Sequence, residues 1–117
     1  MRYLRLFAAI VAAMLIISGC QSNYDEAAFD DDAIIIDVRS LEEFNSGHIS
    51  GAILLPLPRL AEEIIYLVPD LERPVILYCR SGNRSGQALD ILTNMGYTNV
   101  YNLGGILDWT GEIVTNP

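Results

Sequence analysis

The sequence predicts an α/β fold, a three-layer sandwich in which a parallel sheet of four to five strands is flanked by helices. From residue 33 onward, short apolar runs alternate with segments whose apolar residues recur at helical spacing. This alternation is typical of parallel strands joined by crossover helices. A polar loop containing a cysteine follows the third run, and open parallel sheets bind their ligands at such strand ends.

Length and composition limit the classes of protein to which the chain can belong. Its 117 residues suffice for one domain and are too few for two. Hydrophobic residues make up 51% and charged residues 19%, which excludes an intrinsically disordered chain. The formal net charge is −8 and the seven basic residues are scattered arginines, so we expect no nucleic-acid partner.

The N-terminal residues are typical of an export signal. Two arginines precede an apolar run of twelve residues, 6–17, which is shorter than the roughly 20 that span a bilayer. The run ends in Ile17-Ser18-Gly19-Cys20, which resembles the lipobox of bacterial lipoproteins. We therefore expect export, acylation of Cys20 and a lipid anchor in the membrane of a bacterial cell envelope, at the periplasmic face in a Gram-negative host. The residue after Cys20 is Gln21 and not the aspartate that favours retention in the inner membrane of enteric bacteria, so we expect the outer membrane in such a host. An ordinary cleaved signal and an uncleaved anchor are the alternatives.

The chain is expected to divide into three segments. Residues 1–19 form the signal peptide, 20–32 form the acylated cysteine with an acidic tether, and 33–115 form the folded domain. The tether either stays extended or forms a short helix against the domain. The chain has two cysteines, and an acylated Cys20 leaves Cys79 without a disulfide partner. Cys79 is then a lone thiol, either buried and inert or kept for its reactivity.

Four short apolar runs predict the strands. Residues 34–36 form a buried strand that ends at Asp37, and residues 75–78 form the third strand, which leads into the cysteine loop. The remaining strands are 52–55, closed by Pro56, and 99–102.

Helical patterns lie between these strands. The last of them places Ala88, Ile91, Leu92 and Met95 on one stripe and follows it with Gly96, a residue suited to the C-terminal end of a helix. The other helical segments are a capping box at 40–43, an apolar stripe over 57–68 that Pro69 ends, and a turn over 106–109.

The chemistry is expected in the loop after the third strand. It consists of Cys79, Arg80, Ser81, Gly82, Asn83 and Arg84, and Ser85 then opens a helix. The backbone N–H groups of such a loop, together with the helix dipole, form an anion nest that stabilises a thiolate. The pKa of a cysteine in that setting falls below its usual value of about 8.5. Gly82 permits the positive φ of a tight turn, and Arg80 and Arg84 place two cations beside the sulfur.

Several separate motifs accompany this loop along the chain. They are Asp37-Val38-Arg39, Glu43-Phe44, Gly47-His48-Ile49 with Gly51-Ala52, the loop from Cys79 to Ser85, and Gly104-Gly105 with Trp109. In order and spacing these motifs resemble the single-domain rhodanese family, and the resemblance covers about residues 33 to 110.

This resemblance implies a five-stranded parallel sheet and a sulfurtransferase. Cys79 would be the nucleophile, carrying sulfane sulfur as a persulfide from a small-molecule donor such as thiosulfate to an acceptor such as cyanide or a thiol. The substrate-binding residues implied are Arg80, Ser81, Gly82, Asn83 and Arg84, with the amides around the outer sulfur and the two arginines orienting an anionic donor. Asp37, Arg39 and Ser85 would brace the loop. No external cofactor is implied, and one histidine without a cysteine cluster predicts no metal site.

The chain departs from the family pattern at both edges of the fold. The segment before Ile34 is shorter than the usual start, so the first strand of the family fold is expected to be missing or reduced, and the chain ends soon after Trp109. Trp109 is expected to be a core or lid aromatic. His48 is expected to make a structural hydrogen bond and not to act as a base.

Two other functions remain open at this point. A phosphatase or arsenate reductase of the related type needs five residues between its cysteine and arginine, whereas four lie between Cys79 and Arg84. A persulfide carrier or docking module with little turnover would use the same thiol.

Overall fold

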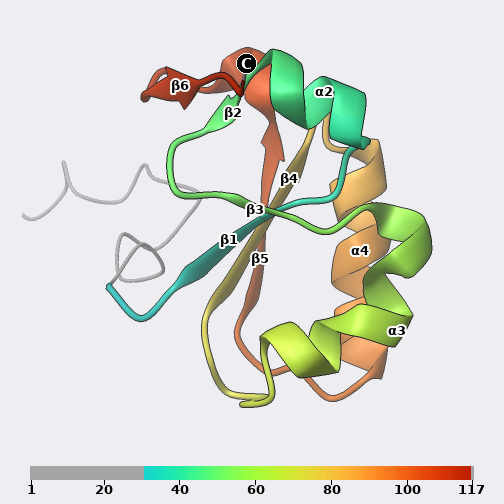
Figure 1. Cartoon of the computed structure of the whole chain (residues 1–117). Coiled ribbons are helices and arrows are strands. Elements are labelled where there is room, and N and C mark those ends of the chain that lie inside the picture. Colours follow the sequence, from blue (N-terminus) through green and yellow to red (C-terminus); the bar gives the residue numbers. More distant parts are fainter. Residues whose placement is uncertain (1–30, 117) are drawn as a thin grey trace, which may run out of the picture.

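The computed structural model describes residues 31–116, which form the α/β domain in Figure 1. The expected signal peptide, Cys20 and nearly all of the tether lie outside the described residues. The strands are β1 (Ile34–Asp37), β2 (His48–Ile49), β3 (Ile53–Leu54), β4 (Val75–Cys79), β5 (Val100–Gly105) and β6 (Ile113–Val114). The helices are α2 (Leu41–Ser46), α3 (Leu57–Leu67) and α4 (Asn83–Asn94), followed by the 3-10 turn η3 (Ile106–Asp108).

A parallel sheet of four strands, in the order β3-β1-β4-β5, forms the centre of the described domain. This confirms the expected α/β fold with flanking helices. The strand β5 is longer than expected. The register of its pairing with β4 shifts between Leu77 and Tyr78 of β4, and the two strands then stay paired until Gly105 lies opposite Cys79. The two glycines that follow the last predicted strand therefore lie next to the cysteine.

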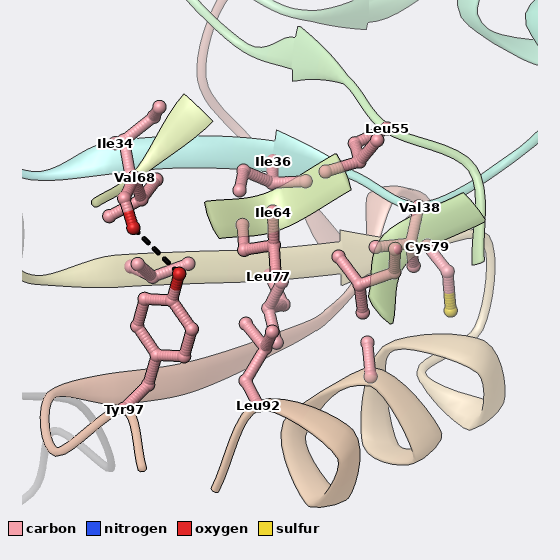
Figure 2. Close-up of a cluster of buried hydrophobic side chains, with 13 residues drawn as sticks. Ile34, Ile36, Val38, Leu55, Ile64, Val68, Leu77, Cys79, Leu92 and Tyr97 are labelled. Carbon is pink, nitrogen blue, oxygen red and sulfur yellow. Dashed lines mark hydrogen bonds between the residues drawn. The ribbon is translucent and has the colours of Figure 1, made fainter. Parts of the chain in front are cut away.

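The hydrophobic core lies between the sheet and the helices α3 and α4, which Figure 1 shows on the same side of the sheet. Alternate residues of the strands point to this side, as Ile36 and Leu77 do in Figure 2. They meet Leu60 and Ile64 of α3 and Leu92 of α4, all fully buried. Burial of each such side chain stabilises the fold by about 1.5–3 kcal/mol. The core thus fixes the helix that follows the cysteine loop against the strand that precedes it.

The start of α4 and the exposure of Met95 differ from the prediction, whereas Gly96 terminates the helix as expected. The helix begins at Asn83 and not at Ser85, so Asn83 and Arg84 belong to its first turn. It ends at Asn94, and Met95, predicted as the last core residue of the stripe, is 37% exposed. The reason is that Gly96, at φ +100°, turns the chain so that the buried Tyr97 fills the core and donates a hydrogen bond to the carbonyl of Val68 at 2.6 Å.

A small antiparallel sheet was not predicted from the sequence. It pairs β2 with β6, with His48 opposite Val114 and Ile49 opposite Ile113. Figure 1 shows it with α2 at the end of the molecule where the parallel strands finish. Between residues 31 and 116, no helix has the length and hydrophobicity needed to cross a membrane.

Candidate active site

Cys79 is the last residue of the fully buried strand β4, and its own side chain is almost completely buried, with 1% exposure. Three residues separate it from the start of α4. The turn depends on Gly82, whose φ of +103° is a conformation that side chains with a Cβ rarely adopt. The expected positive φ is therefore confirmed, and it allows the backbone to turn back over the sulfur within a few residues.

The sulfur of Cys79 accepts hydrogen bonds from the loop that surrounds it. The N–H of Gly82 lies 2.9 Å from Sγ, and the hydroxyl of Ser85 lies 3.4 Å away. Burial alone would raise the pKa of the thiol, but hydrogen bonds from the Ser85 hydroxyl and from the N–H groups of Ser85, Gly82 and Ser81 outweigh it and lower that pKa. The loop therefore favours the thiolate, the reactive form of cysteine.

The loop rests on the end of β5. The hydroxyl of Ser85, fully buried, lies 3.2 Å from the carbonyl of Gly82 and 3.4 Å from that of Gly104. A Cβ at position 105 would collide with the carbonyl oxygen of Arg80 and lie 2.9 Å from the Cα of Ser81. Glycine at this position therefore lets the two backbones touch and supports the loop directly beneath the cysteine.

The two arginines of the loop differ, although both were expected to act on the donor. Arg80 is exposed, and within the described chain its side chain makes no ion pair or hydrogen bond. Arg84 is held by Glu43 of α2 in two hydrogen bonds of 2.7 and 2.9 Å. The hydrogen bond from Arg84 lowers the pKa of Glu43 to about 2, so this pair is fully charged at neutral pH. Only the charge of Arg80 is uncompensated.

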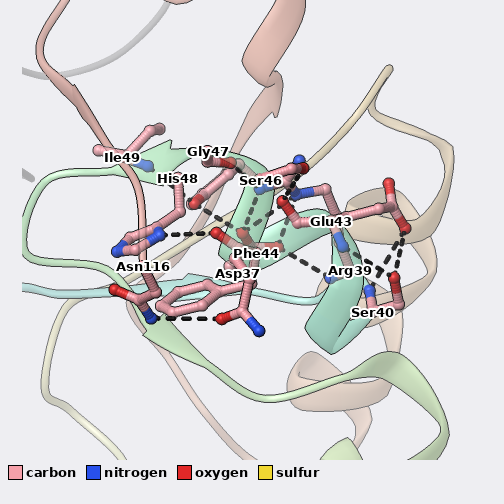
Figure 3. A network of polar contacts seen from close by, with 12 residues as sticks. Asp37, Arg39, Ser40, Glu43, Phe44, Ser46, Gly47, His48, Ile49 and Asn116 are labelled. Carbon is pink, nitrogen blue, oxygen red and sulfur yellow. Dashed lines mark hydrogen bonds and ion pairs between the residues drawn. The ribbon is translucent and has the colours of Figure 1, made fainter.

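A second ion pair, between Asp37 and Arg39, is buried, and both residues are labelled in Figure 3. The carboxylate of Asp37 accepts hydrogen bonds from Arg39 at 2.7–3.0 Å and from the hydroxyl of Tyr78 at 2.8 Å. Arg39 also donates to the carbonyl of Gly47 at 2.6 Å, and the Tyr78 hydroxyl accepts from the N–H of Ile49 at 3.1 Å. Neither Asp37 nor Arg39 bonds to residues 80–84, so their support reaches the loop through Tyr78, the neighbour of Cys79 in β4.

The histidine and the tryptophan occupy supporting positions. His48 is buried, its Nδ1 lies 2.8 Å from the carbonyl of Phe44, and its ring stacks on that of Phe44 with the centroids 3.6 Å apart. This is the structural role expected of His48. Trp109 is half-buried, and its indole N–H donates to the carbonyl of Glu112 at 3.4 Å. Residues 31–116 contain no group of three or more side chains able to bind a metal ion.

A pocket of about 280 Å³ opens beside the loop. Its apolar walls are Val38, Pro56, Leu57 and Pro58. Arg39 and Arg84 also line it, so Arg84 belongs both to the pocket and to the first turn of α4. Val38 packs with Cys79 in the core cluster, and the two lie at the same end of the sheet in Figure 2.

The structure brings together four of the nine site residues predicted from the sequence. Cys79, Gly82 and Ser85 meet around the sulfur, with the N–H of Ser81, while the exposed side chain of Asn83 accepts a hydrogen bond from Gln87. The roles of Glu43 and Tyr78 were missed. Glu43 was noticed as a capping residue, but no sequence signal shows that its carboxylate reaches a residue 41 positions away.

The fold and this site define a class of protein: a parallel α/β domain with a cysteine at the carboxyl end of a strand, whose sulfur accepts hydrogen bonds from the backbone of the following loop. The family of rhodanese-like domains matches residues 21–112. The chain belongs to this family. The match begins before residue 33, where we expect the domain to start.

Individual relatives agree with this assignment. Over 73 residues, 62% of this chain and 70% of the relative, it is 48% identical to thiosulfate sulfurtransferase PspE of Escherichia coli. It is 39% identical over 90 residues to a sulfurtransferase of Allochromatium vinosum, covering 76% of this chain and 82% of that protein. A solved structure described as a rhodanese with anions from E. coli superposes with a TM-score of 0.68 at 43% identity, covering 71% of this chain and 98% of that one.

Proposed function

We propose that the protein is a sulfurtransferase that moves sulfane sulfur from a small-molecule donor to a thiophilic acceptor through a persulfide on Cys79. The observation that carries the proposal is the position of Sγ, 2.9 Å from the N–H of Gly82 and 3.4 Å from the hydroxyl of Ser85, in a loop that lowers the thiol pKa. Sulfurtransferases among the relatives support the same chemistry.

In the first half-reaction, the thiolate of Cys79 attacks the outer sulfur of thiosulfate. A bond forms between Sγ and this sulfur, the sulfur–sulfur bond of thiosulfate breaks, and sulfite leaves with the electron pair. The product is a Cys79 persulfide anion. The N–H groups at the start of α4 and the helix dipole stabilise the negative charge on the outer sulfur, and the exposed Arg80 attracts the dianionic donor.

In the second half-reaction, the acceptor attacks the outer sulfur of the persulfide. The bond from that sulfur to Sγ breaks, and Cys79 leaves with the electron pair as the thiolate that began the cycle. Cyanide yields thiocyanate, and a thiolate yields a new persulfide. The hydrogen bonds that lower the pKa of Cys79 make it a good leaving group, so the same contacts assist both steps.

The geometry is less suited to phosphate or arsenate chemistry. An oxyanion with four oxygens needs hydrogen-bond donors spread around it. Here Arg84 is bound to Glu43, and the loop has one residue fewer than the Cys, five residues, Arg pattern. A low-turnover persulfide carrier would use the same loop, and the rate of the second half-reaction separates it from an enzyme.

We further propose that the domain works at a bacterial envelope membrane, held by lipid on Cys20. The support is the sequence alone: an apolar run of twelve residues that ends in Ile17-Ser18-Gly19-Cys20. Substitution Cys20→Ser is expected to abolish incorporation of radiolabelled fatty acid in a bacterial host. Labelling of the variant at the level of the wild type contradicts the anchor.

The experiment for the enzymatic proposal is a thiocyanate assay with thiosulfate and cyanide on the full chain. We expect Cys79→Ser to lose at least about a thousandfold in rate, because a serine hydroxyl at neutral pH is not ionised and cannot hold sulfane sulfur. The matched control is Cys20→Ser, which removes the other cysteine and should keep the wild-type rate. Turnover that survives Cys79→Ser contradicts the proposal, and persulfide formation without thiocyanate supports the carrier.

A further inference from the structure

Two arginines line the pocket beside the loop, and the guanidinium group of each is already paired. Arg39 lies 2.7 Å from the carboxylate of Asp37, and Arg84 lies 2.7 Å from that of Glu43. Four of the other five lining residues are apolar, and the fifth is the uncharged Ser40. A cavity lined by two paired arginines thus presents almost no net charge to a ligand, and its mostly apolar lining suits an uncharged, apolar group.

Glu43 neutralises Arg84, which lines the pocket and lies in the first turn of the helix that follows the cysteine loop. Its carboxylate comes from α2, whereas Arg84 lies in α4, so the pair joins two elements across the mouth of the site. Glu43 also accepts hydrogen bonds from the N–H of Ser40 at 3.3 Å and from the Ser40 hydroxyl at 3.2 Å, closing the capping box of α2. Its side chain is 31% exposed, and that of Arg84 is 36% exposed. Because Arg84 lines the pocket and the pair is partly exposed, a ligand in the pocket meets an arginine whose charge Glu43 offsets.

We propose that Glu43 determines the charge selectivity of the site: by neutralising Arg84 it weakens the attraction for dianions and adapts the pocket to sulfur donors or acceptors that have an uncharged, apolar body. This proposal rests on the proposed function and deepens it. Without Glu43, a dianionic donor would meet two free cations, Arg80 and Arg84. With Glu43, it meets only Arg80, on a chain whose formal net charge is −8.

The direct test uses the charge of an alkylating reagent. Iodoacetate and iodoacetamide both alkylate a thiolate and differ by one negative charge, so the ratio of their rates at Cys79 reports the local potential independently of thiolate content. Peptide mass spectrometry separates Cys79 from Cys20 in the full chain. In Glu43→Gln the ratio of iodoacetate to iodoacetamide rates should rise about two- to threefold at low salt and return toward the wild-type value at high salt.

Three further variants separate charge from damage to the structure. Glutamine at position 43 keeps the capping box, since this motif takes Glu or Gln at its last position. Glu42→Gln removes the same charge from the exposed neighbour and should leave the ratio unchanged. Arg84→Gln leaves Glu43 unpaired and should lower the ratio, and the double variant Glu43→Gln/Arg84→Gln should restore it.

Donor kinetics test the substrate class. An alkyl thiosulfonate has the same sulfane bond as thiosulfate, one charge less and an apolar group. We expect wild-type kcat/KM to favour the thiosulfonate, and Glu43→Gln to lower the KM for thiosulfate about three- to tenfold while changing that for the thiosulfonate less.

Two results overturn the selectivity proposal. The first is that Glu43→Gln and Arg84→Gln both show the same ratio of iodoacetate to iodoacetamide rates as the control Glu42→Gln. The second is that Glu43→Gln changes the KM for thiosulfate and the KM for the thiosulfonate by the same factor. If the wild type forms no persulfide at all, the proposed function fails, whereas the alkylation ratios still decide the role of Glu43.

Discussion

Two polar regions lie at the same end of the sheet and use the same kinds of group differently. The buried network joins Asp37, Arg39 and Tyr78, and its ion pair is 0% and 6% exposed. The loop region pairs Glu43 with Arg84, and its ion pair is about one third exposed. Both pairs have the same closest N–O distance of 2.7 Å. Distance alone therefore does not separate a structural ion pair from one that controls charge at a reactive site.

The two ion pairs differ in their exposure to solvent, and this exposure determines how much each contributes to stability. A buried pair whose partner is removed leaves an unpaired charge in a medium of low dielectric constant, and this typically costs 3–5 kcal/mol. A pair exposed to water contributes about 0–1 kcal/mol. We conclude that the Asp37 network maintains the fold beneath Cys79, whereas the Glu43 pair affects stability little and adjusts the potential near the thiol.

The largest effect is expected at Asp37. Asp37→Ala should lower the free energy of unfolding by about 3–5 kcal/mol, because Arg39 would remain buried without a counter-charge. Urea denaturation followed by circular dichroism measures this loss. The control is Asp90→Ala, which removes an exposed carboxylate and should change stability by less than about 0.5 kcal/mol. Equal losses in the two variants would contradict a structural role for the network.

A smaller loss is expected at Tyr78. Tyr78→Phe removes the hydroxyl that donates to Asp37 and accepts from the N–H of Ile49. Since both partners are buried, the variant should lose about 1–3 kcal/mol of unfolding free energy and keep a normal thiol. The same denaturation experiment, combined with the alkylation rate of Cys79, tests it. If the variant keeps the full free energy of unfolding but its Cys79 is alkylated more slowly, Tyr78 acts on the reactivity of the thiol and not on stability.

Sequence reasoning was most successful where local pattern decides the structure. Runs of apolar residues located β1 and β4, and the capping box at Ser40 and the turn at Gly82 were both confirmed. These features depend on neighbours within a few residues. The tertiary fold then places Cys79 at a strand end above a helix start, as any parallel α/β sheet does.

Features that join distant segments could not be predicted in this way. The pairing of β2 with β6 uses two residues from each segment, too few to give a periodic pattern. The bond between Glu43 and Arg84 spans 41 residues and depends on how α2 and α4 pack at the pocket. For that reason the sequence predicts only that Arg84 binds the sulfur donor, and the structure is needed to show that Arg84 pairs with Glu43.

In the loop region, Ser85 provides a test of thiolate stabilisation. Ser85→Ala removes a hydroxyl 3.4 Å from Sγ, one of the hydrogen bonds that lower the pKa of Cys79. The pKa of the thiol should rise, so less thiolate is present at any pH below it and alkylation slows there. At high pH, where both proteins are fully ionised, the rates should converge. The pH dependence of iodoacetamide alkylation measures this, and identical profiles would remove Ser85 from the set of stabilising groups.

The smallest effect is expected for stability at Glu43. The pKa of Glu43 falls from 4.5 to about 2 in the folded state, so its pairing contributes to stability above about pH 4.5 and is lost as the pH falls toward 2. Glu43→Gln should therefore lose at most about 1 kcal/mol at pH 7, and this difference should shrink in acid. Denaturation at pH 7 and pH 3 measures both values. A loss comparable with that of Asp37→Ala would erase the distinction between the two regions.

The most direct test of the central claim is to locate sulfur on the protein. The full chain is incubated with thiosulfate in the absence of an acceptor, and peptides containing Cys79 and Cys20 are weighed without reduction. We predict that the Cys79 peptide gains one sulfur atom, that sulfite is released in equal amount, and that cyanide removes the added sulfur. A Cys79 peptide without added sulfur, or sulfur found on Cys20 alone, would contradict the account.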